Sequence, residues 1–353
     1  MTLPTAPRGP GAAPMTETSP SASRPTLRIA GAVLLVGAAG LGSALSFLPS
    51  LRTTMADAPP SKVTPAPVDA DRAYGYLKAI CQIGPRPAGS AANTRQRQMV
   101  ADHFKRHGGQ VREQPFNSTD PVSHAPVAMV NLIGSWFPER ADRVVLGVHY
   151  DTRPFPDEDV VFANRRKPFI GANDGASGVA LLMEIAHHLA ESPTPWGVDL
   201  VLFDGEELVY GGGQNQTGEY FLGSKAFADA YKRSKKDQAR YVAGIVLDMV
   251  GDRELMIDKE PHSLEFAPKL VSAVWGVAKA LKIPQFRDRE GRAVLDDHLP
   301  LNNVGIPTID IIDFDYPYWH TADDLPEHCS GASLAQVGKV VTAWLNQPRP
   351  KAK

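Results

Sequence analysis

The feature that most constrains the fold of this chain is a series of short apolar segments separated by stretches of helical periodicity. The segments 143–148, 199–203, 244–247 and 308–312 are apolar and β-branched, as strands covered on both faces should be. Around them, apolar residues recur at helical spacing in 94–107, 176–190, 224–233, 264–281 and 333–345. This alternation predicts a single α/β domain with a mostly parallel central sheet flanked by helices.

Acidic and histidine side chains follow these predicted strands. In chain order they are His149, Asp151, Asp204, Glu206, Glu207, Asp248 and, a little beyond the last strand, His320. In open parallel sheets, ligands bind beyond the carboxyl ends of the strands. We therefore expect these side chains to meet in one crevice.

Three carboxylates stand within four residues in the segment 204–207. Like charges this close repel one another, so Asp204, Glu206 and Glu207 need a cation or a shared proton, unless the segment is a solvated acidic turn. Neighbouring glutamates on a chain that leaves a strand point in different directions. One of them can then bind a metal ion while the other faces a substrate as general base.

The other candidate ligands each have a structural alternative. His149 is either a buried, hydrogen-bonded histidine or a metal ligand whose tautomer is set by Asp151, which projects to the same side. Asp174 lies between glycines in the segment 171–178. It is either the N-cap of a helix or a metal ligand that the flexible glycines bring close to an ion. Asp248 follows an apolar strand, so it is paired or a ligand.

Two histidines and three carboxylates form a donor set of nitrogen and oxygen atoms, which is typical of catalytic zinc. Five ligands suffice for two ions that share a bridging carboxylate, or for one ion with a hydrogen-bonding shell. The two cysteines, Cys81 and Cys329, belong to no C-x-x-C pair, so a cysteine-ligated metal is not expected. They either pair in an oxidising compartment or remain buried free thiols.

The first seventy residues differ from the rest in composition. Residues 1–28 are rich in Pro, Ser, Ala and Gly, which predicts a disordered cytoplasmic N-terminus. Residues 29–51 carry no charge and are long enough to span a bilayer, 52–72 form a Pro-rich linker, and 73–348 form the catalytic domain. Arg8, Arg24 and Arg28 precede the span with only Glu17 against them, which predicts export of the domain to the periplasmic or extracellular face.

A cleavable signal peptide is the alternative to this anchor. The pattern Ala56-Asp57-Ala58 fits a cleavage site, but Pro59 would become the new N-terminus, a poor position for a signal peptidase. We therefore expect an uncleaved anchor that holds the protein on a membrane. The formal net charge of −2 and a lone basic cluster at 232–236 argue against a nucleic-acid partner.

In order and spacing, these motifs resemble the zinc-dependent aminopeptidase superfamily, which also contains the glutaminyl-peptide cyclotransferases. The matching motifs are 149–151 (HYD), 171–174 (GAND), 204–207 (DGEE), 247–249 (LDM) and 320–321 (HT), and the resemblance covers roughly 73–345. It implies a three-layer zinc-exopeptidase fold with Asp174, Glu207 and His320 as the core zinc ligands. In the two-zinc peptidases, positions like His149 and Asp248 complete a second site, with Asp174 bridging.

Two further segments are similar to the cyclotransferase branch. The segment 296–307 (DDHLPLNNVGIP) looks like one in which an acid followed by Asp-His-x-Pro contributes to the active site. The resemblance implies a catalytic role for Asp296 and a substrate contact for His298. Trp319 is similar to an indole that borders the substrate pocket. In the loop after Glu207, where animal cyclotransferases carry a tryptophan, Tyr210 is the aromatic candidate for binding substrate.

As a cyclotransferase, the chain would convert the N-terminal Gln of peptides to pyroglutamate with release of ammonia. Zinc would polarise the amide carbonyl, Glu206 would move the proton, and Asp248 and Asp296 would hold the amine or the leaving group. As an aminopeptidase, Glu206 would activate water and Asp248 would bind a second ion. A third hypothesis is an anchored binding ectodomain without catalysis, against which the intact Glu206 and the full ligand set argue.

Overall fold

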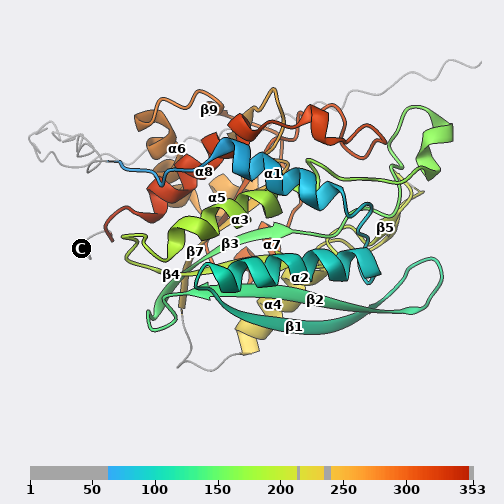
Figure 1. Ribbon diagram of the computed structural model, residues 1–353, viewed down its shortest axis with the longest axis horizontal. Helices are drawn as coiled ribbons and strands as arrows, with labels where there is room; N and C mark the ends of the chain where they lie inside the picture. Colours follow the sequence, from blue (N-terminus) through green and yellow to red (C-terminus); the bar gives the residue numbers. More distant parts are fainter. Residues whose placement is uncertain (1–62, 213–214, 234–239, 350–353) are drawn as a thin grey trace, which may run out of the picture. The chain divides into compact units, whose positions relative to one another are not determined.

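The computed structural model describes residues 63–212, 215–233 and 240–349. A six-stranded sheet forms the centre of this part, with the strand order β1-β2-β4-β3-β7-β10 (Figure 1). Its strands are β1 (Gln110–Thr119), β2 (Pro126–Trp136), β3 (Asp142–His149), β4 (Gly197–Phe203), β7 (Arg240–Asp248) and β10 (Thr308–Ile312). Two short pairs lie outside it, β5 (Val209–Tyr210) with β6 (Thr217–Gly218) and β8 (Ile257–Lys259) with β9 (Phe286–Glu290).

Four neighbouring strands of the sheet are parallel and two are not. Strands β4, β3, β7 and β10 pair in parallel, whereas β2 is antiparallel to both β1 and β4. The parallel strands are the four that the sequence predicts, and the predicted mostly parallel α/β sheet is confirmed. Their carboxyl ends therefore meet at one edge of the sheet, where the functional side chains were expected.

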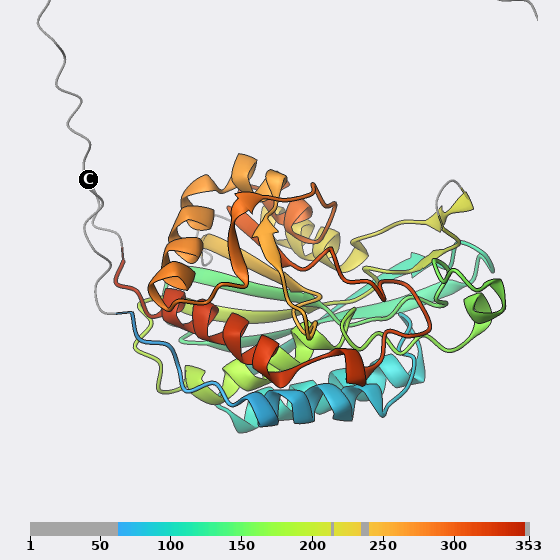
Figure 2. The same ribbon diagram turned by 90° about the horizontal axis from the view of Figure 1, so that it is seen from above.

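Helices cover both faces of the sheet, which gives three layers (Figure 2). One face carries α1 (Ala70–Cys81), α2 (Ala91–Arg106), α3 (Ser177–Leu189) and α8 (Gly331–Leu345). On the other face lie α4 (Leu222–Arg233) and α7 (His298–Asn303), while α5 (Pro261–Phe266) packs on β10 and α6 (Pro268–Ala280) packs on α8. Short 3-10 helices occur at η1 (Phe162–Arg166) and η3 (Pro326–His328).

The side chains of β3 show how one strand serves two hydrophobic cores. Val144, Leu146 and Val148 pack with α3 and the helices beside it, whereas Val145 packs into the cluster under α4 and α7. This is the period-two alternation of a strand that is buried on both faces.

The larger differences from the predicted elements are a divided helix, two strands and one further helix. The predicted helix 264–281 is two helices, α5 and α6, because Pro268 cannot donate a backbone hydrogen bond and begins a new helix after Ala267. Strands β1 and β2 were missed, since β1 is a polar, half-exposed edge strand that owes its pairing to β2. Helix α1 was also missed, although Ala73, Leu77 and Ile80 lie on one buried face.

The fold begins before residue 73, where the predicted linker ends. Val68 is buried and Asp69 caps the start of α1, so the last residues of that segment belong to the folded part. The predicted anchor at 29–51 lies outside the described residues. Within the described residues, no helix is both long and apolar enough to cross a membrane. Cys81 and Cys329 are both buried free thiols.

Candidate metal centre

Five potential ligands converge at the carboxyl edge of the parallel strands. His149 and Asp248 are the last residues of the neighbouring strands β3 and β7, and Glu207 follows β4. Asp174 lies in the loop before α3, and His320 in the loop after β10. Asp248 is partly exposed and the other four are buried. The predicted convergence is therefore present.

The distances between these side chains form two linked groups. His149 Nε2 lies 3.2 Å from Asp174 Oδ1 and 3.2 Å from Asp248 Oδ1. His320 Nε2 lies 2.7 Å from Glu207 Oε1 and 3.4 Å from Asp174 Oδ2. Asp174 thus stands between the two histidines, with one carboxylate oxygen toward each, which suits either one ion or a bridged pair.

These residues fit zinc by their chemistry and by what they leave unsatisfied. One ligand atom each from His149, Asp174 and Glu207 lies within 4.8 Å of the other two. Asp174 Oδ2 is buried and has no hydrogen-bond partner among the described residues. A buried carboxylate oxygen without a partner costs free energy that a cation would remove. Imidazole and carboxylate donors without thiolate are typical of catalytic zinc.

Glycines let the chain bring Asp174 to the strand ends. Gly175 has φ +98°, and a Cβ at this position would lie 2.6 Å from the carbonyl oxygen of Asp151. Helix α3 begins at Ser177 with Ala176 as its cap residue, so Asp174 is not the N-cap that was its alternative reading.

Two residues at the centre have left-handed backbone conformations without being glycine. His320 has φ +54° and Met249, directly after Asp248, has φ +46°. Such conformations cost free energy and cluster at functional sites. They support a role for this edge of the sheet beyond folding.

Asp151 and Asp204 hold the turn that carries the two glutamates. Asp151 accepts the backbone N–H groups of Glu206 and Glu207, each at 3.0 Å. Its carboxylate is 4.0 Å from His149 Nδ1, too far for the tautomer-fixing hydrogen bond that the sequence predicts. The fully buried Asp151 is therefore a positioning residue. Asp204 accepts the backbone N–H of Val130 and a side-chain N–H of Asn93, and so anchors the start of the turn.

Glu206 lies beside the ligands without joining their closest contacts. Its Oε2 is 3.8 Å from His149 Nδ1, and its side chain keeps a small exposed fraction. Burial raises the pKa of Glu206 well above its usual range, and the negative charges of Glu207, Asp297 and Asp296 act in the same direction. A carboxyl group in this setting is suited to take up a proton and return it.

Sequence reasoning gave no role to two residues that hold the ligands. The backbone N–H of Arg153 donates to Glu207 Oε2 at 2.9 Å, and its guanidinium lies 3.5 Å from Oε1. Asp324 accepts the backbone N–H of Asn173 at 2.8 Å and of Asp174 at 3.1 Å. Their only sequence signals are nearness to Asp151 and to His320, because the partners are 54 and 150 residues away.

A second acidic cluster lies beside Asp248. It contains Asp296, His298 and Asp310, with one potential ligand atom of each within 4.8 Å of the others. Burial and the charge of Asp248 raise the pKa of Asp296 to about 6. His298 is fully buried, and its Nε2 lies 3.3 Å from Glu260 Oε2. His298 is therefore buried within this cluster, and its predicted contact with substrate stays a prediction.

The two aromatic candidates have different surroundings. The indole of Trp319 stacks on His320, with ring centroids 3.8 Å apart and an interplanar angle of 25°. The hydroxyl of Tyr210 donates to Asp120 Oδ2 at 2.6 Å, and its ring packs near Phe155. Trp319 thus stacks on a predicted zinc ligand. The predicted contact of Tyr210 with substrate stays a prediction.

Comparisons with known proteins agree with this geometry. Residues 131–345 match the model of peptidase family M28. The chain is 39% identical to a glutaminyl cyclase of Fimbriiglobus ruber, with a TM-score of 0.78 over 82% of this chain and 98% of that one. It is 33% identical to a leucine aminopeptidase precursor of Bacteroides thetaiotaomicron, with a TM-score of 0.74 over 80% and 98% of the two chains.

A curated relative also resembles the glutaminyl cyclases. A glutaminyl-peptide cyclotransferase-like protein of Bos taurus is 24% identical in an alignment of 304 positions that covers 76% of this chain and 73% of that protein. The family model covers more than half of the 353 residues, including all five potential metal ligands. The chain therefore belongs to peptidase family M28, whose fold it shares with glutaminyl cyclases and zinc exopeptidases.

Proposed function

We propose that this protein is a zinc-dependent glutaminyl-peptide cyclotransferase, which converts the N-terminal Gln of peptides to pyroglutamate and releases ammonia. Asp174, Glu207 and His320 would hold the zinc, and His149 and Asp248 stand ready for a second ion or for substrate. When bound there, zinc would supply a Lewis acid for the carbonyl of the Gln side-chain amide.

The observation that carries the proposal is the placement of Asp296. Its buried carboxyl oxygen Oδ2 has no hydrogen-bond partner within the described ranges. The charge of Asp296 raises the pKa of Glu206, and the charge of Asp248 raises the pKa of Asp296, so Asp296 lies near both residues. An amine that attacks and an ammonia that leaves both need such acceptors close to the base. The 39% identity to a glutaminyl cyclase supports the same conclusion.

The chain's own residues account for each proton in the reaction. The α-amine nitrogen of the substrate attacks the carbon of its side-chain amide, and Glu206 takes a proton from that nitrogen. The carbon–nitrogen bond of the amide then breaks, and Glu206 returns the proton to the departing group as ammonia. Asp248 and Asp296 hold the amine and the leaving nitrogen by hydrogen bonds. Trp319 borders the pocket and excludes water from the ring closure.

An aminopeptidase is the second candidate. It is favoured by the equal 3.2 Å distances from His149 Nε2 to Asp174 and Asp248, a grouping that suits a second ion. Here Glu206 would take a proton from water, and the peptide bond would break to release the first residue. The likeness to a leucine aminopeptidase precursor supports this alternative.

Product analysis separates the two candidates. The zinc-loaded full chain is incubated with two peptides that differ only in their first residue, Gln or Leu. Cyclisation releases ammonia from the Gln peptide and shortens neither peptide, and it is the expected result. Release of free leucine or glutamine would contradict the proposal and support the peptidase. Absence of both products from a zinc-loaded protein would support the noncatalytic ectodomain.

The exported, membrane-anchored placement of the domain is a proposal from the sequence. It rests on the uncharged segment 29–51 and on the arginines before it. A full chain that remains in the membrane pellet after a high-salt wash would support it, and a protein freed by the wash would contradict it.

A further inference from the structure

Three histidines meet at the end of the molecule where α2 and α3 finish. His103 lies in the last turn of α2, His107 is the residue that ends this helix, and His187 lies in the last turn of α3. The ring centroids are 4.5 Å apart for His103 and His107, 3.9 Å for His107 and His187, and 5.2 Å for His103 and His187. One ring nitrogen of each lies within 4.8 Å of the other two.

This cluster is separate from the candidate metal centre. His187 follows Ser177 by ten residues, which is about 15 Å along the axis of α3. The candidate metal centre lies before the first turn of α3, and the histidines lie at its last turn. The two groups therefore share no residue.

The positions of His103 and His107 are those of a chelating pair. Residues four apart lie on the same face of a helix, one turn above each other. His187 completes the set from the neighbouring helix. Three imidazoles without thiolate or carboxylate suit zinc and similar divalent transition ions, and they leave a fourth position for solvent.

Two of the rings have a hydrogen bond on one ring nitrogen, as metal-bound histidines usually do. His103 Nε2 lies 2.8 Å from the carbonyl oxygen of Met183, so this nitrogen donates and Nδ1 keeps the lone pair. His187 Nε2 bonds to the hydroxyl of Tyr76 at 2.5 Å. A carbonyl or hydroxyl partner on one ring nitrogen orients the other toward an ion.

Burial and the neighbouring positive charges favour the neutral form of these imidazole rings. Burial lowers the pKa of His103 and of His187 to about 4, and the neighbouring Arg72 acts in the same direction on His187. The rings therefore have few protons to lose on binding a metal near pH 7. Arg72 itself is paired with Glu184 at 2.6 Å, which offsets part of its repulsion toward a cation. The charge of Arg106 also lowers the pKa of His103 and of His107.

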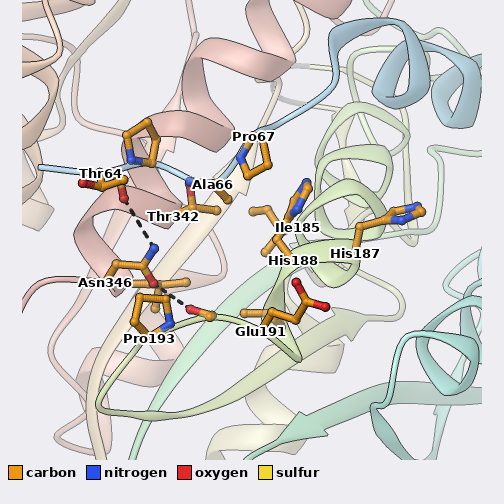
Figure 3. Close-up of a pocket in the computed structure, with 14 residues that line it drawn as sticks. Thr64, Ala66, Pro67, Ile185, His187, His188, Glu191, Pro193, Thr342 and Asn346 are labelled. Atoms are coloured by element: carbon orange, nitrogen blue, oxygen red, sulfur yellow. Dashed lines mark hydrogen bonds between the residues drawn. The ribbon is translucent and has the colours of Figure 1, made fainter.

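The cluster is open to solvent on one side. His107 and His187 are half-buried, whereas His103 is buried. His187 and His188 both border a pocket beside Thr64 and Asn346, and Figure 3 shows their rings pointing to different sides. Because His107 and His187 are only half-buried, an ion can reach them from solvent without passing through the core.

We propose that His103, His107 and His187 form a second metal site, which binds a divalent transition ion such as Zn²⁺ and ties the end of α2 to the end of α3. In a tetrahedral zinc site the ligand nitrogens are roughly 3.3 Å apart, so the half-buried rings of His107 and His187 rotate inward on binding. This inference goes beyond the proposed function and does not rest on it.

Metal content of the full chain tests the site. After equilibrium dialysis against micromolar Zn²⁺, the wild-type protein is expected to hold one more ion per chain than His107→Ala or His187→Gln. The control His124→Asn removes an exposed imidazole outside the cluster, and asparagine tolerates the φ of +58° there. It is expected to match the wild type. Equal metal content in all four proteins would overturn the proposal.

Two further readouts guard against a folding defect. The metal-free variants are expected to melt within a few degrees of the metal-free wild type and to keep its peptide turnover when the candidate metal centre is zinc-loaded. A labelling experiment on the wild type needs no variant. Zn²⁺ is expected to protect His107 and His187 from carbethoxylation, as mapped by peptide mass, while His124 stays reactive. Unchanged labelling of His107 and His187 would overturn the proposal without any variant.

Discussion

The carboxylate of Asp324 accepts the backbone N–H of Asp174, at 3.1 Å, and so holds a predicted zinc ligand from 150 residues away. The same carboxylate accepts the N–H of Asn173 and the hydroxyl of Tyr316. Burial and the charge of Asp174 raise the pKa of Asp324 to about 7. Three donors directed at one buried carboxylate fix the loop in front of α3.

Replacing Asp324 is therefore expected to loosen the metal centre. In Asp324→Asn, one carboxylate oxygen becomes an NH2 group, which cannot accept a hydrogen bond from a backbone N–H. The loop then loses one of the bonds that fix the position of Asp174. Zinc affinity is expected to fall roughly 10- to 100-fold, the usual loss for such supporting residues. Competition with a chromophoric chelator measures it. The exposed neighbour gives the matched control, Asp323→Asn, which is expected to keep wild-type affinity. Equal affinities in the two variants would contradict this role.

Glu206 is expected to be needed for turnover and not for zinc. Gln has the same shape but cannot take up a proton, so Glu206→Gln is expected to lower kcat about 10²- to 10⁴-fold. Its zinc content is expected to remain that of the wild type. Glu207→Gln is the comparison, because it removes a predicted ligand and is expected to lose zinc. A Glu206→Gln protein that turns over at the wild-type rate would remove Glu206 from the base role.

The ion pair of Asp199 and Arg143 is expected to matter for stability alone. Asp199 accepts Arg143 Nη2 at 2.6 Å and Nε at 2.9 Å, and both side chains are buried. Asp199→Ala leaves a buried guanidinium without its counterion, so the free energy of unfolding in urea is expected to fall by about 3–5 kcal/mol.

The control for Asp199 is a more exposed acid of the same sheet. Asp142 pairs with Arg240 at 2.7 Å, and the side chain of Arg240 is largely exposed. Asp142→Ala is expected to cost less than about 1 kcal/mol, as is usual for surface ion pairs. Similar losses of unfolding free energy in the two variants would contradict the prediction that the buried ion pair matters more than the exposed one. Zinc content is expected to stay unchanged in both.

Asp313 is expected to make stability depend on pH. Burial raises the pKa of Asp313 to about 7, above its value of 3.8 in a model compound. Between these two values the folded state binds more protons than the unfolded state, so the free energy of unfolding falls as pH rises. Asp313→Asn stays uncharged and can still accept the backbone N–H of Met256. Its advantage over the wild type is expected to grow from pH 4 to pH 7 in urea unfolding. An advantage that is constant over this range would contradict the raised pKa.

Local pattern was enough to locate the strands that carry the site. Val144 to Val148 and the other parallel strands are apolar on both faces, and a strand of that kind is recognisable without its neighbours. Because parallel strands present their carboxyl ends at one edge, the convergence of His149 with Asp248 followed from their order in the chain. The identities of the donor atoms then indicated zinc.

The residues that hold this site in place could not be read in the same way. Asp324 and Arg153 are ordinary polar residues in sequence, and each acquires its role from partners that only the folded chain brings near. The edge strand β1 is similar, because its polar side chains form a strand only against β2.

The parallel strands, the acidic and histidine side chains at their ends and the adjacent pair Glu206 and Glu207 could all be predicted from the sequence alone. These follow from local periodicity and from the chemistry of single side chains. The folded chain was needed to see that Asp151 supports the backbone of the two glutamates instead of orienting His149, and that His103 and His107 meet His187. Such contacts depend on the packing of helices and strands far apart in the chain, and distances of a few ångströms decide them.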